Sequence, residues 1–408
     1  MTQFSARSDI MRSAVLAQVG ALGPTSRASL ARQLSVSPAL VTQITKQLIA
    51  DGLLVELDHS PSQGGRPARL LGLVADAGRV IGVKVVADHI TVVEVGIDGT
   101  VVRSATEPFD AASATAIPTL ATLLRAFIAG GNDRPILGVG VGVPGDVDDQ
   151  SLGNVDSTQL GWSHVPLGDV LRRELSLPVL VENNVNALAM AELLHGQARG
   201  HDNVLVITIG TGVGAGIIAD GSVLRGHGGG AGEIGHLPTL ENGPRCTCGA
   251  DGCLESLIGQ EALVATARER GIIGDAAGMR TLLGRANEGD TAAQELFSHA
   301  GHLLGRALAG VVNTIDPEIV ILLGEGVEAW SHWSFGFEPA FRSGLMPRKR
   351  GVPVAVETWQ DDRWAQGAAS LVLATPFDAA GRTGEQGRLV RERLIEPTPR
   401  DGARGAGR

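Results

Sequence analysis

Hydrophobic residues in the first 75 positions follow helical spacing and then alternate as in a β-hairpin. The first helical pattern begins at Ile10, and Ser26 and Ser37 are suited to cap a second and a third helix. Pro38 would occupy the first position of the third helix, where its fixed φ is favourable. The expected elements are helices over 10–22, 27–34 and 38–51 and strands over 53–57 and 68–74. Together they predict a compact amino-terminal module over 1–75.

The third helix has one apolar face and one polar face that contains no acidic residue. Two short helices joined by a three-residue turn favour a helix-turn-helix whose second helix enters the DNA major groove, although an ordinary helical hairpin has the same pattern. The glycine-rich loop between the two strands would form a wing that can reach a phosphate or the minor groove. The residues expected to contact DNA are Ser37, Ala39, Thr42, Gln43, Lys46 and Arg66.

From position 79 onward apolar strands alternate with helical segments, which is typical of α/β structure. The main expected strands cover 80–86, 90–95, 100–104, 136–141, 178–181, 204–209, 215–218 and 319–323, and the main expected helices cover 118–129, 185–195, 262–270, 279–286, 292–315 and 363–373. This second module is predicted to span 79–375. Residues 376–408 are rich in Gly, Arg, Glu and Pro, and we expect a mostly disordered tail there.

Composition adds an uneven distribution of charge to this picture. The chain has 408 residues, 43% of them hydrophobic and 19% charged, which excludes a disordered protein and allows more than one domain. Residues 1–70 contain seven basic and four acidic side chains, whereas the whole chain has a net charge of -10. A small basic module therefore precedes a large acidic one, and DNA binding is expected only of the first.

The chain has no apolar stretch near the roughly 20 residues that cross a bilayer, and its polar start differs from a signal peptide. We therefore expect a cytoplasmic protein without a membrane partner. All three cysteines lie within eight residues, at Cys246, Cys248 and Cys253. In a reducing compartment such a cluster indicates metal binding rather than disulfides.

A histidine precedes this cysteine cluster and completes a set of four possible metal ligands. His236, Cys246, Cys248 and Cys253 supply one imidazole and three thiols, a set that suits tetrahedral Zn²⁺. Four protein ligands leave no open coordination position, so the site would be structural and a zinc-dependent enzyme is not expected. Free buried cysteines with an unrelated histidine are the alternative.

A second glycine cluster, Gly210-Thr211-Gly212-Val213-Gly214, joins two expected strands. Its backbone amides could approach a phosphate closely, but a tight hairpin has the same sequence pattern. Because no helix follows, it is not a dinucleotide-binding fingerprint.

Several of these motifs together resemble the ROK family of bacterial sugar kinases and sugar-responsive repressors. The resemblance covers about residues 10–375, and it rests most firmly on the segments around His236 and the cysteines. The other motifs that carry it are Gly138-Val139-Gly140-Val141-Gly142-Val143-Pro144-Gly145, Leu160-Gly161-Trp162, Glu182-Asn183-Asn184, the glycine cluster and Glu233-Ile234-Gly235-His236. The resemblance implies a winged helix-turn-helix followed by a two-lobed, actin-like (ribonuclease H-like) α/β domain that binds a sugar in its interlobe cleft.

The resemblance also implies which residues bind the sugar, namely Asn183, Asn184, Glu233, His236 and Glu255. Amides and carboxylates suit this role because they donate to, or accept from, vicinal hydroxyl groups. His236 would bind zinc through one ring nitrogen and face the sugar with its other edge. Taken without the neighbouring motifs, Glu233 and Glu255 would be read as solvated surface carboxylates.

Three departures from the family's kinase motifs argue against phosphoryl transfer. Lys84 stands where the kinases have the aspartate of a phosphate-binding loop, and Asn184 stands where they have the aspartate that accepts the proton of the attacking hydroxyl. Glu325 interrupts a loop that is usually all glycine on the adenosine side. We therefore expect a non-enzymatic, sugar-responsive regulator, most simply a repressor, with operator DNA and a sugar or sugar phosphate as partners. It would act as a homodimer or homotetramer, and a sugar kinase with an added DNA-binding domain is the alternative.

Overall fold

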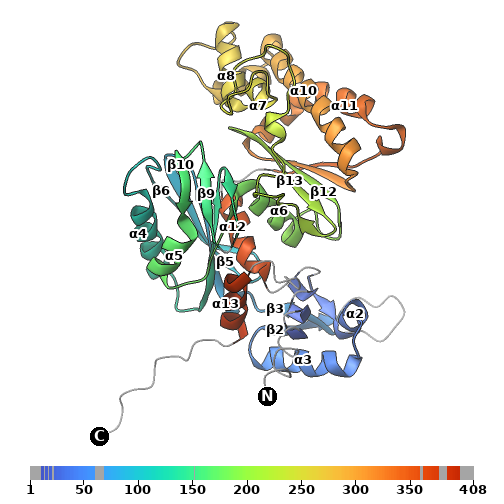
Figure 1. The fold of residues 1–408 in the computed structure, drawn as a ribbon. Coiled ribbons are helices and arrows are strands. Elements are labelled where there is room, and N and C mark those ends of the chain that lie inside the picture. The colour runs from blue at the N-terminus through green and yellow to red at the C-terminus, as the bar shows by residue number, and fades with distance from the viewer. Residues whose placement is uncertain are drawn as a thin grey trace. The chain divides into compact units, whose positions relative to one another are not determined.

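The computed structural model describes the chain except for residues 1–10, 13, 17, 21–22, 60–68, 151, 359–361, 376–383 and 396–408 (Figure 1). The chain divides into two compact units. The first unit combines residues 1–200 with 362–408, and the second consists of 201–361. The amino-terminal module therefore belongs to the same unit as the first half of the α/β region.

The amino-terminal module contains the helices and the hairpin that its sequence predicts. Residues 11–12, 14–16 and 18–20 are helical, and α2 (Arg27–Gln33) and α3 (Pro38–Ala50) follow. Three strands, β1 (Thr25–Ser26), β2 (Leu54–His59) and β3 (Arg69–Leu73), form an antiparallel sheet in the order β1-β3-β2. Ser26 and Ser37 cap the two helices, with Ser37 Oγ accepting a hydrogen bond of 3.3 Å from the Leu40 N–H.

The first unit is built around a five-stranded sheet in the order β11-β7-β4-β5-β6. Strands β11, β7 and β4 run parallel, while β5 and β6 continue β4 as an antiparallel meander. The bounds of these strands are β4 (Arg79–Val85), β5 (His89–Gly96), β6 (Val101–Pro108), β7 (Ile136–Val143) and β11 (Val179–Asn183). A small sheet of β8 (Asp146–Val147), β9 (Asn154–Ser157) and β10 (Trp162–Pro166) follows β7 along the chain. The helices of this unit are α4 (Ala116–Ala129), α5 (Leu167–Leu175), α6 (Asn184–His195), α12 (Arg363–Leu373) and α13 (Gly384–Ile395).

Alternating glycines in the central strands let helix α12 lie directly on the sheet. A Cβ atom at Gly140 would lie 1.8 Å from the Ala368 carbonyl oxygen, and one at Gly82 would lie 2.0 Å from that of Ala365. Neither contact is possible for a larger residue without a shift of the helix backbone. The valines that alternate with the glycines face the opposite side and join a separate hydrophobic core with α4 and α5.

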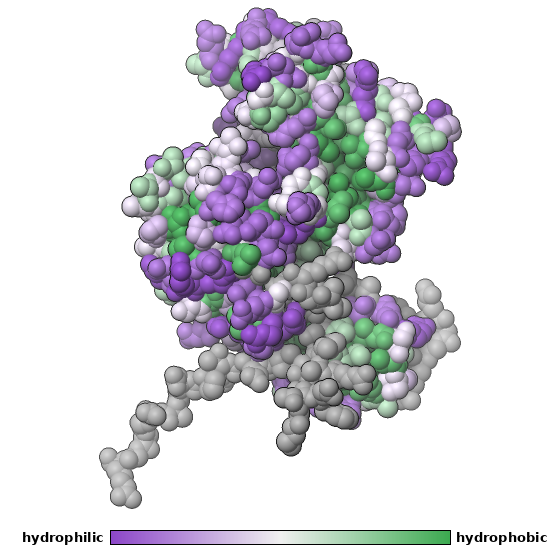
Figure 2. Space-filling model, viewed as in Figure 1, coloured by the Kyte–Doolittle hydropathy of each residue, from purple (hydrophilic) through white to green (hydrophobic). Residues whose placement is uncertain are grey.

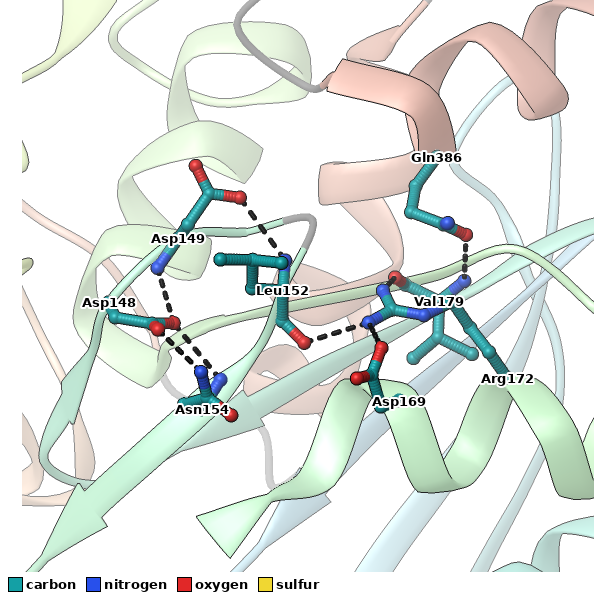
Figure 3. A network of polar contacts seen from close by, with 8 residues as sticks. All are labelled: Asp148, Asp149, Leu152, Asn154, Asp169, Arg172, Val179 and Gln386. Atoms are coloured by element: carbon teal, nitrogen blue, oxygen red, sulfur yellow. Dashed lines mark hydrogen bonds and ion pairs between the residues drawn. The ribbon is translucent and has the colours of Figure 1, made fainter. Parts of the chain in front are cut away.

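The predicted disorder of the carboxyl-terminal tail is wrong for residues 384–395, which form α13. Val390 and Leu394 of this helix are buried in a core that also contains Leu48 and Leu71 of the amino-terminal module. Gln386 Oε1 accepts a hydrogen bond of 3.3 Å from the Val179 N–H, at the start of β11 (Figure 3). The rest of the predicted tail, 376–383 and 396–408, lies outside the described residues.

Arg172 of α5 also hydrogen-bonds to the first residue of β11, and it contacts a neighbouring loop in the polar network of Figure 3. The Arg172 guanidinium donates hydrogen bonds to the carbonyl oxygens of Val179, at 3.1 Å, and Leu152, at 2.8 Å, and to the Asp169 carboxylate, at 2.6 Å. Helices α5 and α13, which are about half the chain apart in sequence, therefore both hydrogen-bond to the first residue of β11.

The second unit also contains a five-stranded sheet, in the order β14-β13-β12-β15-β16. The long helix α10 packs along α11, and together with α7, α8 and α9 they form one core on the sheet. The bounds are β12 (Val204–Ile209), β13 (Val213–Ala219), β14 (Ser222–Val223), β15 (Ile319–Leu323), β16 (Val354–Val356), α7 (Glu255–Ile258), α8 (Gln260–Glu269), α9 (Met279–Asn287), α10 (Thr291–Ile315) and α11 (Trp330–Gly344), with short 3₁₀ turns η1 (Ala75–Ala77), η2 (Ile234–His236), η3 (Glu325–Ala329) and η4 (Pro347–Lys349). The bounds of α8, α9 and α10 agree with the predicted helices within a few residues, whereas α11 was not predicted.

None of the described helices is both long and apolar enough to cross a bilayer. Hydrophilic and hydrophobic residues are interspersed on the face drawn in Figure 2. Large exposed apolar side chains such as Phe335 and Val102 are present in both units.

Candidate functional site

The four predicted metal ligands come together in the second unit. The ligand atoms of His236, Cys246, Cys248 and Cys253 all lie within 4.8 Å of one another. The Cys248 and Cys253 sulfurs are 3.7 Å apart, and Cys246 Sγ lies 3.4 Å from His236 Nδ1. Cys246 and Cys253 are buried, His236 is half-buried and Cys248 is exposed.

The 3.7 Å and 3.4 Å separations fit a tetrahedral zinc site. With Zn–S bonds near 2.3 Å and Zn–N bonds near 2.0 Å, tetrahedral angles put two sulfurs about 3.8 Å apart and sulfur and nitrogen about 3.5 Å apart. Burial raises the pKa of the Cys253 thiol to about 12. A hydrogen bond from the Ala250 backbone lowers the pKa of Cys248. A bound cation would replace the thiol protons and hold the surrounding loop together.

Tight turns bring the three cysteines to the histidine. The Cys246 N–H donates to the Ala250 carbonyl, at 2.8 Å, and the Gly249 N–H donates to the Cys246 carbonyl, at 3.0 Å. Gly252 has a φ of +71°, and a Cβ atom there would lie 1.8 Å from the Leu240 carbonyl oxygen. Only glycine fits this position, which directs Cys253 back toward His236 at the end of η2.

Glu255, at the start of α7, connects the cysteine segment to the glycine cluster. Its Oε2 accepts a hydrogen bond of 2.8 Å from the Val213 N–H, the first residue of β13. Ile209 pairs with Val213 across the antiparallel strands β12 and β13, so Gly210-Thr211-Gly212 forms a hairpin turn. This turn corresponds to the hairpin alternative of the sequence analysis, and the Glu255 carboxylate lies against it.

Glu233 lies beside the histidine, on the side away from the cysteines. Its Oε2 is 3.6 Å from His236 Nε2, whereas His236 Nδ1 faces Cys246. The Glu233 side chain is half exposed. The second unit therefore contains three of the predicted sugar-binding residues, Glu233, His236 and Glu255, all between the start of η2 and the start of α7.

Asn183 and Asn184 lie in the first unit, where β11 gives way to α6. Asn183 caps α6, since its Oδ1 accepts hydrogen bonds from the Val185 and Asn186 N–H groups and its Nδ2 donates to the Gly145 carbonyl oxygen at 2.9 Å. The Asn184 amide is half-buried and makes no hydrogen bond with the described residues. Of the two predicted sugar ligands, Asn183 is thus largely occupied by the helix cap and Asn184 is available.

Two buried polar residues that were not predicted as site residues lie next to this pair. Glu182 is only 1% exposed and accepts hydrogen bonds from Gln150 Nε2, at 2.7 Å, and from the Asn183 N–H, at 2.8 Å. Asn186 is 2% exposed, and its Oδ1 has no hydrogen-bond partner among the described residues. Their signal in the sequence is a glutamate ending an apolar strand and an asparagine in an otherwise apolar helix.

Lys84 lies near the end of β4, in the same sheet row as Gly142 of β7 and Glu182 of β11. Its ammonium nitrogen is 5.3 Å from the centroid of the Trp364 ring, a cation–π distance. A cation therefore lies in this row of the sheet, beside the Trp364 ring.

The outer face of α3 is exposed as predicted. Ser37, Ala39, Gln43 and Lys46 are exposed, and Thr42 is half-buried with its hydroxyl donating to the Pro38 carbonyl oxygen. The opposite face is buried by Val41, Ile44, Thr45 and Leu48. Arg66, the predicted wing residue, lies outside the described residues.

The fold and the His/Cys cluster define the chain as a two-unit α/β protein that carries an amino-terminal helical module. The chain belongs to the ROK family, whose family model matches residues 80–375. The family match ends close to the end of α12 and leaves the amino-terminal module outside it.

Curated relatives of similar length are transcriptional regulators. The xylose repressor of Bacillus subtilis is 28% identical over 312 residues, which cover 75% of this chain and 79% of the relative. The DNA-binding transcriptional dual regulator NagC of Escherichia coli is 28% identical over 371 residues, covering 88% and 91% of the two chains.

Solved structures with the same fold include both a regulator and kinases. A ROK family transcriptional regulator, described as a homologue of the E. coli MLC protein, matches with a TM-score of 0.77 at 24% identity and covers 95% of this chain and 98% of its own. A ROK glucokinase from Streptomyces griseus, solved with glucose and AMPPNP, has a TM-score of 0.64 at 28% identity, with coverage of 72% and 99%. The regulator match thus extends over the amino-terminal module, whereas the glucokinase match covers a smaller share of this chain.

Proposed function

We propose that this protein is a sugar-responsive transcriptional regulator, most simply a repressor. The observation that carries the proposal is the combination of a ROK domain over 80–375 with a preceding module whose helix α3 exposes a polar face without acidic residues. Relatives named xylose repressor and N-acetylglucosamine repressor cover most of the chain and support the same function.

The amino-terminal module would bind operator DNA as a winged helix-turn-helix. Helix α3 would enter the major groove with Gln43 and Lys46, while Ser37, Ala39 and Thr42 would approach the backbone or base edges near its start. The β2–β3 hairpin would be the wing, with Arg66 at its tip reaching a phosphate or the minor groove. A homodimer or homotetramer would present two such modules to a two-fold symmetric operator.

The ROK domain would bind the effector, a sugar or sugar phosphate. Asn184 and the second N–H of Asn183 Nδ2, beside the one donated to the Gly145 carbonyl, would bind the sugar from the first unit, and Glu233, His236 and Glu255 would bind it from the second. The free Asn184 amide supports this assignment, because an unpaired half-buried amide gains a partner in a sugar hydroxyl. Zinc held by His236 and the three cysteines would fix the position of Glu255 and Glu233 without taking part in any reaction.

Effector binding would reach the DNA-binding module through the core that the two share. Leu48 of α3 and Leu71 of β3 are buried in one cluster with Val80 and Val95 of the first unit's sheet. A ligand that favours one arrangement of the ROK domain over another would then change the spacing of the two modules in an oligomer. Coupling between effector binding and DNA binding needs only that the effector binds one of these arrangements more tightly than the other.

The experiment that tests the proposal measures DNA binding and sugar binding on the same protein. Operator sequences selected from random DNA should bind with high affinity, and one of the sugars xylose, N-acetylglucosamine, glucose or their 6-phosphates should raise the melting temperature and weaken that binding. Failure to select any sequence would reject the DNA-binding role. A ligand that raises the melting temperature but leaves operator affinity unchanged would reject the regulatory coupling.

A sugar kinase remains the second candidate because solved ROK kinases share the fold. Phosphoryl transfer needs a base for the attacking hydroxyl and positioned metal and phosphates. Asn184 offers no basicity, and Lys84 offers no carboxylate for a metal. A non-enzymatic role therefore fits the residues better.

A further inference from the structure

A chain of polar contacts joins α3 to the base of the β2–β3 hairpin in the amino-terminal module. The Arg27 guanidinium, at the start of α2, donates one hydrogen bond of 2.9 Å to Thr45 Oγ1 of α3 and another of 2.8 Å to the Glu56 carboxylate of β2. The other oxygen of that carboxylate accepts a hydrogen bond from Arg69, the first residue of β3. Glu56 therefore lies between two guanidinium groups that come from different elements.

The register of the hairpin places this cluster on the side that faces the helices. Glu56 pairs directly with Leu71, which is completely buried, so both side chains point toward the helices. Arg69 precedes Leu71 by two positions on β3 and lies on the same side, because side chains alternate along a strand. Strand β2 packs against α3, and β3 packs against α2 (Figure 1). The Arg69 side chain therefore lies on the side of the hairpin that also carries α3.

The cluster contains one accessible arginine and one anchored arginine. Arg69 bonds to Glu56 through Nη1, and its side chain is 62% exposed. Its Nε and Nη2 groups have no hydrogen-bond partner among the described residues. Arg27 is mostly buried and uses two of its nitrogens on Thr45 and Glu56. Arg69 is thus the member of the cluster that can reach a partner molecule.

The charges of the cluster favour an anionic partner. Hydrogen bonds from Arg69 and Arg27 lower the pKa of the Glu56 carboxyl, so this group is ionised at neutral pH. Two guanidinium groups and one carboxylate give a net charge of +1. A guanidinium that shares one nitrogen with a carboxylate can still bind a phosphate oxygen through its other N–H groups. A duplex that receives α3 in its major groove presents backbone phosphates along both edges of that groove.

We propose that Arg69 binds a backbone phosphate of the operator and that Glu56 is the residue that positions it. Arg27 holds Glu56 relative to α3 through its bond to Thr45, so the phosphate contact has a fixed position relative to the helix in the groove. This inference rests on the proposed DNA-binding function, to which it adds a contacting residue and a positioning residue at the base of the wing.

Variants of Arg69 test the phosphate contact. Anisotropy titrations of the full chain, with a duplex that it selects from random DNA and with a random duplex of equal length, give both affinities at several salt concentrations. Arg69→Ala should weaken both about three- to tenfold and lower the slope of log affinity against log salt concentration by about one. Arg69→Lys keeps a cation and should restore the slope. Arg306→Ala, on the exposed side of α10, removes the same charge and should leave affinity and slope unchanged.

Glu56→Gln tests the positioning role. The substitution removes a negative charge beside the DNA, which should raise the affinity for the random duplex, but it also releases Arg69 from its fixed position. The operator depends on that position and should gain less, so the ratio of operator affinity to random-duplex affinity should fall about three- to tenfold. A purely structural ion pair would change the melting temperature and leave this ratio unchanged. Glu107→Gln, at an exposed position of β6, makes the same charge change and should also leave the ratio unchanged.

Two results would overturn the inference. One is Arg69→Ala with the salt slope of the unmodified protein, and the other is Glu56→Gln with an unchanged affinity ratio. Arg69 is exposed, so its variants still decide if Glu56→Gln does not fold. Failure of the proposed function is a different result, because the unmodified protein would then select no duplex and both conclusions would fall together. A selected operator that binds Arg69→Ala and the unmodified protein equally would remove only the inference.

Discussion

The Glu255 carboxylate accepts a hydrogen bond of 2.8 Å from the backbone N–H of Val213. This bond joins the helix that follows the cysteine segment to the hairpin turn of the glycine cluster. Val213 is 4% exposed, so its N–H has little access to water if the carboxylate is removed.

Replacing Glu255 should therefore separate its structural role from its charge. Glu255→Ala leaves a buried N–H unpaired and should lower the free energy of unfolding by about 1–3 kcal/mol. Glu255→Gln keeps an acceptor and should cost less than half of that. Urea denaturation of both variants and of the unmodified protein measures the difference, and unchanged stability in Glu255→Ala would show that the hydrogen bond contributes nothing.

Zinc should be present at about one ion per chain in the purified protein, because four protein ligands make one closed site. Cys248→Ser should lose most of the metal and lower the melting temperature, since metal binding stabilises only the folded state. Thr247→Ala, at the exposed neighbouring position, should leave the metal content and the melting temperature unchanged. Elemental analysis with thiol titration checks this. A metal-free native protein with three reactive thiols would reject the site.

Burial of His195 should make stability depend on pH. Burial is the main cause that lowers the pKa of His195 below its ordinary 6.5, with Arg199 and Arg363 adding to it and Asp98 opposing it, and Nε2 is buried without a partner among the described residues. Below about pH 6.5 the unfolded chain takes up a proton that the folded chain resists, so stability is complete above that pH and falls as the pH is lowered toward the depressed native pKa.

His195→Leu should remove this part of the pH dependence. The slope of the unfolding free energy between about pH 7 and pH 5 should decrease by at most about 1 kcal/mol per pH unit. His227→Gln, at an exposed site in the second unit, serves as the matched control and should retain the slope. Denaturant titrations over this range measure both, and an unchanged slope in His195→Leu would contradict the expectation.

Lys46→Ala should weaken operator binding. It should also reduce the slope of log affinity against log salt concentration by about one, because each phosphate contact releases about one counterion. Sugar binding should be unaffected. Arg306→Ala removes the same charge from the exposed side of α10 and should leave operator affinity intact. Fluorescence anisotropy at several salt concentrations measures the operator affinity of Lys46→Ala and Arg306→Ala. Equal losses in both variants would point to net charge rather than to the α3 surface.

The unmodified protein should not transfer phosphate from ATP to any of the screened sugars. Asn184→Asp alone should not create turnover, because the Lys84 side chain, beside Trp364, supplies no carboxylate for a metal. A ROK glucokinase assayed in parallel verifies the conditions. Turnover by the unmodified protein that disappears in Asn184→Ala would overturn the non-enzymatic assignment.

Features encoded by neighbouring residues were predictable from the sequence by itself. Ser37 and Pro38 determined the start of α3 because capping and a fixed φ act within one turn. The four metal ligands were identified because three of them lie within eight residues and suit one kind of ion. The glycine and valine alternation of β7 predicted a buried strand for the same local reason.

Features that depend on distant segments were decided only by the tertiary structure. Helix α11 contains Gly336 and Pro339, which weaken its helical signal, yet Gly336 lets it approach α10 so closely that a Cβ atom would lie 1.8 Å from the Ser298 carbonyl oxygen. Helix α13 has few apolar residues, but Val390 and Leu394 are buried in a core formed by segments hundreds of positions earlier.

The same distinction separates the residues of the candidate site. That Asn183 caps a helix while Asn184 stays free depends on where β11 ends, and the burial of Glu182 depends on Gln150 from another loop. A sequence specifies which chemical groups are available. Which of them are already satisfied by hydrogen bonds is decided by the contacts that folding brings together.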